Sequence, residues 1–214
     1  MIRFRPHNKC RFLLRSWATY AMLLLILANP ITASATQAPD VVIREVFREL
    51  LNQLDLKRQE DTLTHESVRE IFATLLNPRI DYLSLARWIL RDHWVNASDD
   101  QQTEFLHAFE LYIINTYALA LSDGKRIELE VEDNPLLRKN TAVVTAGIKV
   151  ADADAVPLDF RLIQRDERWL LFDVSFSGVS LARTFRSDFN YVAKDGGIDA
   201  VTTHLIRRRE GSTP

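Results

Sequence analysis

The stretch 169-WLLFDVSFSGVSLARTFRSDF-189 begins with the pattern of a β-strand. Residues on one face of a strand recur every two positions, and here the alternation predicts one strongly apolar face. That face consists of Leu170, Phe172, Val174 and Phe176. The opposite face is predicted to carry Trp169, Leu171, Asp173 and Ser175.

At Gly178 the period changes to three or four residues, which predicts an amphipathic helix directly after the strand. Its apolar stripe consists of Leu181, Phe185, Phe189 and Val192. A strand and a helix that each present an apolar face predict a hydrophobic space between them. Either protein side chains or a ligand would fill that space.

Three more strands are predicted upstream of this stretch, at 126–132, 142–150 and 156–162, each with a two-residue period. Short polar connections join them, and a tight turn is predicted at 152–155. Consecutive strands with short connections predict an antiparallel meander. A final helix is predicted at 198–209, after the pair Gly196 and Gly197.

Helical periodicity precedes the strands. Helices are predicted from Asp40, from Thr64 and from Asp81, with Asp40 capping the first and His93 on the buried face of the third. The longest runs from Ser98 to about residue 121, because Ser98 and Gln101 form a capping box and Gly124 follows its end. Helices, then a sheet, then helices predict an α+β fold, with about four curved antiparallel strands and six or so helices in a single domain over 36–214.

The first 35 residues have the pattern of a cleavable secretory signal: a basic start, an apolar run at 17–28, and Ala33-Ser34-Ala35 as the cleavage motif. The alternative is an uncleaved membrane anchor, but the apolar run is shorter than the roughly 20 residues a spanning helix needs. Cleavage would remove five of the 27 basic residues and leave 22 against 29 acidic ones. A surface this acidic argues against a nucleic-acid partner. Cleavage would also remove the only cysteine, Cys10.

Sequence motifs for catalysis or metal binding are absent. The chain has no phosphate loop, dinucleotide fingerprint, H-E-x-x-H or G-x-S-x-G, and its histidines lack metal-ligand spacing. Ser180 follows Gly178 at the corner between strand and helix, where capping the helix is its expected role. Asp152 and Asp154 predict a turn, since the other residues of a calcium loop are missing. Asp173 beside an apolar wall leaves open a general base with a raised pKa.

The opening stretch closely resembles the C-terminal signature of the MlaC family, periplasmic phospholipid-binding proteins of the Mla lipid-transport pathway, also known as toluene-tolerance proteins. The matching positions are Trp169, Asp173, Val174, Gly178, Val179, Ser180, Leu181, Phe185, Arg186, Ser187 and Phe189. A second similar block covers 81–117 and includes His93 and Trp94. Two positions depart from the family pattern: Arg91 stands where a glycine is expected, and Ser177 where an acidic residue is common.

The resemblance implies an NTF2-like fold whose sheet and helices enclose an apolar cavity for phospholipid acyl chains. The residues expected to line it are Phe105, Phe109, Ile113, Tyr117, Val144, Ala146, Ile148, Leu158, Phe160, Leu162, Phe172 and Val174. Arg186 is the cation expected to contact a headgroup or to close the domain, with a structural salt bridge as the alternative. Phospholipid is the implied cargo, and no cofactor is expected.

The resemblance also implies a soluble periplasmic carrier that shuttles lipid between an inner-membrane ABC transporter, with its substrate-binding subunit, and an outer-membrane lipoprotein complex. Composition alone favours an ordinary packed core for the same apolar faces. Three other classes stay open: an NTF2-like periplasmic enzyme, a lipid-free adaptor subunit, and a membrane-anchored subunit.

Overall fold

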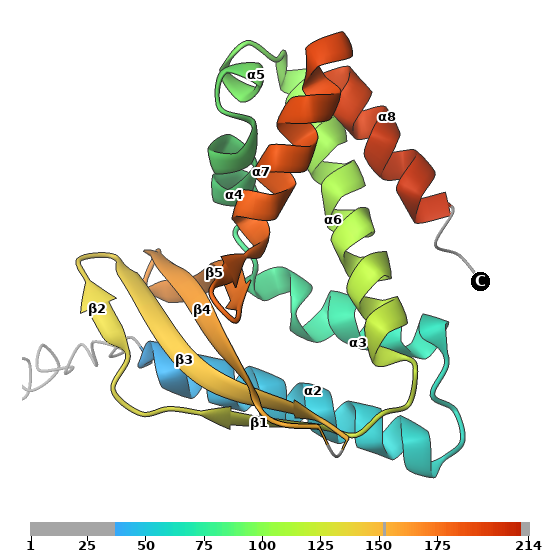
Figure 1. Cartoon of the computed structure of the whole chain (residues 1–214), viewed down its shortest axis with the longest axis vertical. Coiled ribbons are helices and arrows are strands. Elements are labelled where there is room, and N and C mark those ends of the chain that lie inside the picture. Colours follow the sequence, from blue (N-terminus) through green and yellow to red (C-terminus); the bar gives the residue numbers. More distant parts are fainter. Residues whose placement is uncertain (1–36, 152, 211–214) are drawn as a thin grey trace, which may run out of the picture. The chain divides into compact units, whose positions relative to one another are not determined.

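The computed structural model describes residues 37–151 and 153–210. The predicted signal segment and Asp152 of the predicted turn lie outside the described residues. Within them, helices come first, then an antiparallel sheet, then helices again (Figure 1). This order confirms the predicted α+β fold.

The helices of the described part are α2 (Pro39–Gln59), α3 (His65–Leu75), α4 (Tyr82–Leu90), α5 (Asp92–Val95), α6 (Asp99–Leu121), α7 (Leu181–Val192) and α8 (Gly197–Glu210). Two short 3-10 turns, η1 (Asn77–Arg79) and η2 (Ala193–Asp195), follow α3 and α7. The strands are β1 (Ile127–Val131), β2 (Leu136–Arg138), β3 (Thr141–Val150), β4 (Val156–Arg165), β5 (Arg168–Phe176) and β6 (Val179–Ser180).

The sheet contains the four predicted strands in chain order, β1, β3, β4 and β5, each antiparallel to the next. Two short strands were not predicted. Strand β2 pairs with the start of β3 on the same edge as β1, and β6 pairs with the end of β5. Three residues or fewer are too few for a two-residue period to be recognised in a sequence.

A β-bulge in β5 corrects the predicted alternation of its side chains. Arg161 pairs with Asp173, but the next residue, Leu162, pairs with Leu171, so Phe172 has no partner in the ladder. An unpaired extra residue reverses the faces of all residues beyond it. Leu171 therefore lies on the same face as Val174, where the alternation had placed it opposite.

Helix α2 covers one face of the sheet, and Figure 1 shows it behind the strands. Val42, Ile43 and Val46 of α2 are buried there. They pack against the sheet residues Ala142, Val144, Ala146, Leu158, Phe160, Leu162 and Trp169. Phe47 adds a ring contact to Phe160 with the centroids 5.1 Å apart. We call this side of the sheet the α2 face. Its residues are the set of alternating strand residues that is buried beneath α2.

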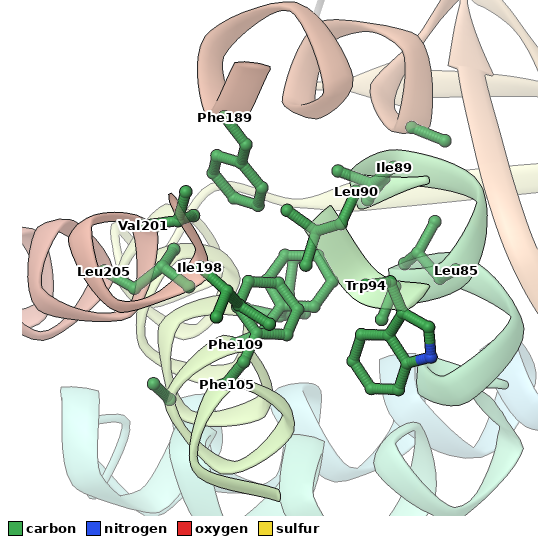
Figure 2. Packing of buried hydrophobic residues seen from close by; sticks show 14 of the residues in the cluster. Leu85, Ile89, Leu90, Trp94, Phe105, Phe109, Phe189, Ile198, Val201 and Leu205 are labelled. Atoms are coloured by element: carbon green, nitrogen blue, oxygen red, sulfur yellow. The ribbon is translucent and has the colours of Figure 1, made fainter. Parts of the chain in front are cut away.

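A second core lies among α4, α5, α6, α7 and α8 (Figure 2). Phe105 and Phe109 of α6 are fully buried at its centre and stack on each other at 5.5 Å. Phe189 of α7 meets both rings edge-on. A third, smaller core joins the C-terminal half of α2 to α3 and α6 through Leu50, Leu54, Val68, Ile71 and Ala118.

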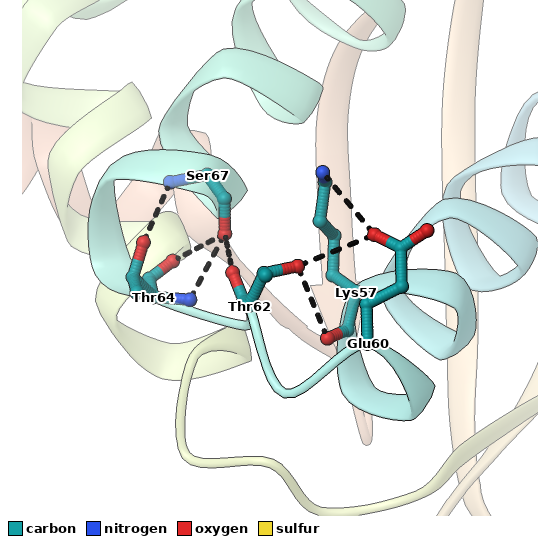
Figure 3. Close-up of polar contacts among 5 residues, drawn as sticks. All are labelled: Lys57, Glu60, Thr62, Thr64 and Ser67. Carbon is teal, nitrogen blue, oxygen red and sulfur yellow. Dashed lines mark hydrogen bonds and ion pairs between the residues drawn. The ribbon is translucent and has the colours of Figure 1, made fainter.

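Local capping explains where most helices begin. Thr64 and Ser67 form a capping box at the start of α3 (Figure 3), and Ser98 and Gln101 form the predicted one at α6. Ser180 caps α7 with its side chain, as expected, and Asp81, near which the third helix was predicted to begin, caps α4. The prediction for Asp40 was wrong: α2 begins one residue earlier, with Pro39 in its first turn and Ala38 at the cap position. Proline suits the first turn of a helix because a backbone N–H there has no partner within the helix, so its absence costs nothing.

The third predicted helix is interrupted at Arg91, so His93 does not continue its buried face. Arg91 has φ 49° and ψ −112°, which ends α4 and begins the short α5. Trp94 is the buried residue of α5. Glycine adopts such a conformation without strain, so the family's expected glycine at this position has a backbone reason.

Ser177, the other departure, also has a positive φ. Ser177 and Gly178 have φ 47° and 80° and join β5 to β6 by a two-residue turn. Both central residues of a type I′ hairpin turn require positive φ, which asparagine, aspartate and glycine adopt most readily. The expected acidic residue would therefore serve the turn.

Candidate functional site

The predicted lining residues fall into two groups rather than one continuous wall. Phe105, Phe109 and Ile113 belong to the helical core, with Tyr117 packed against it. The sheet residues lie on the α2 face: Val144, Ala146, Leu158, Phe160 and Leu162 are buried, and Ile148 and Val174 are half-buried. Phe172, the bulge residue, is half-buried and belongs to none of the three cores.

The most buried members of both groups contact other side chains. Phe109 is fully buried among Phe105, Tyr82, Phe185 and Phe189. Phe160 is 1% exposed beneath α2. Only the half-buried lining residues therefore have apolar surface that a ligand could contact.

The two groups approach each other at Leu76, at the end of α3. Leu76 is half-buried and packs against all three cores. Nearby, Phe72 stacks on Tyr117 with ring centroids 6.4 Å apart, and Leu171 lies on the sheet side. We define the seam as Leu76, which packs against both groups, together with half-buried Tyr117 of the helical core and half-buried Leu171 and Val174 of the sheet core. The sequence did not identify Leu76 or Leu171 as lining residues. Leu76 has the same spacing as the other apolar residues of its helix, and the bulge places the Leu171 side chain on the opposite face from the one predicted.

A polar tie joins the helical layer to β5 at one end of the seam. Ile80 bridges to Leu171, and the Asp81 N–H donates to the Leu171 carbonyl at 2.8 Å. The Asp81 carboxylate caps α4 and pairs with Arg165 of β4 at 3.3 Å, while Arg165 also donates to Ser84 Oγ. Burial opposes ionisation of Asp81, but hydrogen bonds from Ser84 and Arg165 and the Arg165 charge outweigh it and lower its pKa below 3.8.

A second tie joins β5 to the start of α7. Asp173 is 7% exposed, and its carboxylate accepts from Ser180 Oγ at 2.7 Å and from the Ala182 N–H at 2.9 Å. Arg161 lies 3.9 Å from the same carboxylate. Ser180 Oγ in turn accepts from the Arg183 N–H and caps the helix. Asp173 and Ser180 therefore have structural partners that account for both oxygens and the hydroxyl.

Tyr117 is the polar group of the seam. Burial, with smaller contributions from Tyr112 and the negative charge of Asp173, raises the pKa of Tyr117 to about 12. Its phenol is protonated at physiological pH and is available as a hydrogen-bond donor.

Arg186 contacts α4 rather than an acidic side chain. Its guanidinium lies 5.2 Å from the centre of the Trp88 ring, and among the described residues it forms no ion pair. The interaction is a cation–π contact between α7 and α4. A contact with a lipid headgroup stays a prediction.

Two hollows on the surface lie away from the predicted lining. One, of about 320 Å³, is lined by Gln37, Val42, Arg79, Arg168 and neighbouring residues. The other, of about 430 Å³, follows the β6 to α7 corner with Arg183, Thr184 and Ser187. Both are rich in polar and charged residues and contain none of the twelve predicted lining residues.

Within 37–151 and 153–210, no helix combines the length and apolar composition needed to cross a membrane. The same residues contain no group of three or more His, Cys, Asp and Glu side chains arranged to hold a metal ion.

Comparison with known proteins relates this arrangement to one family. The model of the MlaC protein family matches residues 44–207. The toluene tolerance protein ttg2D of Pseudomonas putida is 21% identical over 181 residues, 83% of each chain. The intermembrane phospholipid transport system binding protein MlaC of Haemophilus influenzae is 20% identical over 179 residues, 81% of this chain and 83% of that protein.

A solved structure has the same fold. It is a phospholipid-binding protein from Ralstonia solanacearum in complex with a phospholipid, 20% identical, with a TM-score of 0.74 over 82% of this chain and 99% of that one. The match of the family model over most of the described residues, together with this shared fold, shows that the chain belongs to the MlaC family.

Proposed function

We propose that this protein is a periplasmic phospholipid carrier of an intermembrane lipid transport system. Residues 1–35 would direct export and be removed, leaving 36–214 as one lipid-binding domain. The protein would hold acyl chains between its helical layer and its sheet, without catalysing a reaction. Family membership and a fold shared with a phospholipid-bound structure support this proposal.

The seam carries the proposal within this chain. Leu76 packs against both cores, and Tyr117 of the helical core and Leu171 and Val174 of the sheet core are half-buried. Acyl chains entering there would separate the α6 group, Phe105, Phe109, Ile113 and Tyr117, from the sheet group. The ties at Asp81 and Asp173 hold β5 to the helical layer, so this edge would stay joined while the space widens.

Energetics explain why such a carrier would need partners. Burying one CH₂ is worth about 0.8 kcal/mol, so two tails of roughly 16 carbons total about 25 kcal/mol, beyond the practical affinity limit of about 18 to 21 kcal/mol. Transfer from a bilayer gives far less, because the tails leave an apolar environment for another. The carrier would hold lipid firmly in water and exchange it only when docked to a membrane complex.

The chain has no phosphate loop for a nucleotide, so directional energy would come from a partner. The proposed partners are an inner-membrane ABC transporter with its substrate-binding subunit and an outer-membrane lipoprotein complex.

The proposal is tested by extracting lipid from the protein itself. The full chain would be expressed, the exported protein purified without detergent, and an organic extract analysed by mass spectrometry, with native mass spectrometry for stoichiometry. A diacyl phospholipid in about equimolar amount is expected. A folded protein that carries no lipid and takes none up from vesicles would instead indicate an adaptor.

A further inference from the structure

Strand β2 exposes two adjacent leucines at the edge of the sheet. Leu136 is 68% exposed and Leu137 61% exposed, more than most large apolar residues of the described chain. Arg138 and Lys139 follow them directly and are also exposed. We call residues 136–139 the β2 tip.

The two leucines point to opposite faces of the sheet. Leu136 pairs with Val143, which pairs with Arg161 on the face away from α2. Leu137 pairs with Ala142, which pairs with Leu162 on the α2 face. Directly paired residues share a face, so α2 lies on the side of Leu137 yet leaves it exposed. The β2 tip therefore projects apolar side chains in both directions.

The neighbouring edge strand is built differently. Strand β1 lies on the same edge of β3, and its alternate residues Glu128 and Glu130 are exposed acids. Charged residues are a usual protection of an edge strand against unwanted pairing. Leu136 of β2 lies on the same face as these glutamates, and Leu137 lies on the opposite face, beyond the reach of α2. An exposed leucine on each face of an edge strand calls for a partner that accepts both.

The charge around the tip is positive. Among the described residues, neither Arg138 nor Lys139 forms an ion pair, whereas nearby Asp133 is held by Arg44. The β4 to β5 turn lies beside the tip, since the Gln164 N–H donates to the Asn140 carbonyl. That turn adds Asp166, Glu167 and Arg168, whereas the charge of Arg165 is paired with Asp81. Together with Arg138 and Lys139, these three residues leave one net positive charge.

We infer that the β2 tip is a docking site for the surface of an anionic lipid bilayer. A flat protein surface would bury Leu136 or Leu137 but not both, because they leave the strand on opposite sides. A fluid bilayer surrounds a projecting edge, so both leucines enter the region below the headgroups. Arg138 and Lys139 then lie at the level of the phosphates, as basic residues beside inserted apolar ones do.

This docking site extends the proposed carrier role, because it would bring the seam close to the membrane from which lipid is taken. It is tested separately from that role. Vesicle binding reports the β2 tip, whereas lipid extracted from the purified protein reports the cargo site.

The experiment is flotation of the purified exported protein with vesicles of phosphatidylglycerol and phosphatidylethanolamine, compared with neutral phosphatidylcholine vesicles. Binding to the anionic vesicles is expected to fall with added salt. Each basic residue near an anionic surface contributes about fivefold in binding, so Arg138→Gln with Lys139→Gln should weaken binding about 30-fold. Leu136→Ser with Leu137→Ser should abolish the salt-resistant part.

Matched controls separate the tip from general effects. Lys125→Gln with Arg126→Gln removes a Lys and Arg pair at the opposite end of the sheet, and Leu56→Ser removes another exposed leucine, on α2. Both should bind like the wild type. Equal loss in controls and tip variants, or no binding of the wild type to anionic vesicles, would overturn the inference. So would a dimer of the wild type in gel filtration that the leucine variants dissolve, because the tip would then pair with a second copy.

Discussion

Asp173 shows how one residue's surroundings decide its chemistry. Its position beside an apolar strand face suggested a general base, but the structure surrounds the carboxylate with the Ser180 hydroxyl, the Ala182 N–H and Arg161. A carboxylate at the first turn of a helix satisfies a free N–H and complements the helix dipole. Its place in the structure is to attach α7 to β5.

Asp173→Asn should destabilise the protein without changing its backbone. The amide keeps one oxygen to accept from the Ala182 N–H, and its NH2 group must donate to Ser180 Oγ where the carboxylate accepted, so both buried hydrogen bonds lose the support of the charge. Hydrogen bonds to charged groups contribute about 1.5 to 3 kcal/mol, and we expect a loss of about 2 kcal/mol in the free energy of unfolding, measured with urea.

Asp188→Asn on the exposed side of the same helix is the control, and its stability should change by less than about 0.5 kcal/mol. If Asp173→Asn were as stable as the wild type, the capping role would be wrong and a base role would regain interest.

At the scale of elements, Arg91 divides one predicted helix into α4 and α5. Its φ of 49° with ψ −112° lies in a region that only glycine occupies freely. Such conformations cost about 1 to 3 kcal/mol, and the surrounding packing of Leu90 and Trp94 holds this one in place.

Arg91→Gly should therefore raise stability by about 1 kcal/mol, because the relief of strain exceeds the added chain entropy of glycine. The midpoint of thermal unfolding should rise by about 2 to 4 °C. Arg87→Gly within α4 is the control and should lower stability by about 1 kcal/mol, since its position is ordinary helix. A fall in stability for both would show that Arg91 makes a contact worth more than its strain.

Asp81 connects three elements, capping α4, pairing with Arg165 of β4 and lying next to the bridge to β5. Its pKa is lowered by folding, so the unfolded chain binds the proton more readily than the folded one. The stability it contributes is complete above its ordinary pKa of 3.8 and is lost as the pH falls through the lowered value.

Asp81→Asn keeps a good helix cap but removes the charge, and the pair is partly exposed, so the loss at pH 7 should be at most about 1 kcal/mol. Unfolding free energies of wild type and variant should converge as the pH falls from 5 to about 2.5. Asp154→Asn, in the exposed connection after β3, should show no such convergence. A constant difference across this range would mean that the Asp81 charge does not stabilise the fold.

At the scale of the domain, the helical core and the sheet core meet at Leu76 of the seam. Val174 lies on the α2 face beside Asp173 and pairs across the sheet with Phe160. Val131 of β1 is also half-buried on that face and packs against the same core, but at the edge far from β5. The two valines offer a matched test of where cargo binds.

Val174→Trp should fill the seam and reduce bound phospholipid at least fivefold, because overpacking costs about 1 to 3 kcal/mol in the loaded state. Val131→Trp should retain wild-type lipid. Lipid per protein is measured by extraction and mass spectrometry, with circular dichroism to confirm that both variants fold. Equal lipid in both variants would place the cargo elsewhere.

The sequence alone located the long strands and most of the helices, because their signals are local. The two-residue and 3.6-residue periods located the long strands and helices, and capping side chains such as Ser98 and Ser180 marked helix starts within one turn. Together with the signature around Gly178 they also indicated the family.

Only the tertiary structure decided which faces meet. Periodicity predicts which residues share a face but not what covers it, so the α6 group and the sheet group looked like one lining although they belong to separate cores. The bulge at Phe172 arises from pairing with β4, and the meeting of three cores at Leu76 from contacts between residues far apart in the chain. Such long-range pairings leave no local pattern, because their free energy depends on neighbours that only the folded chain provides.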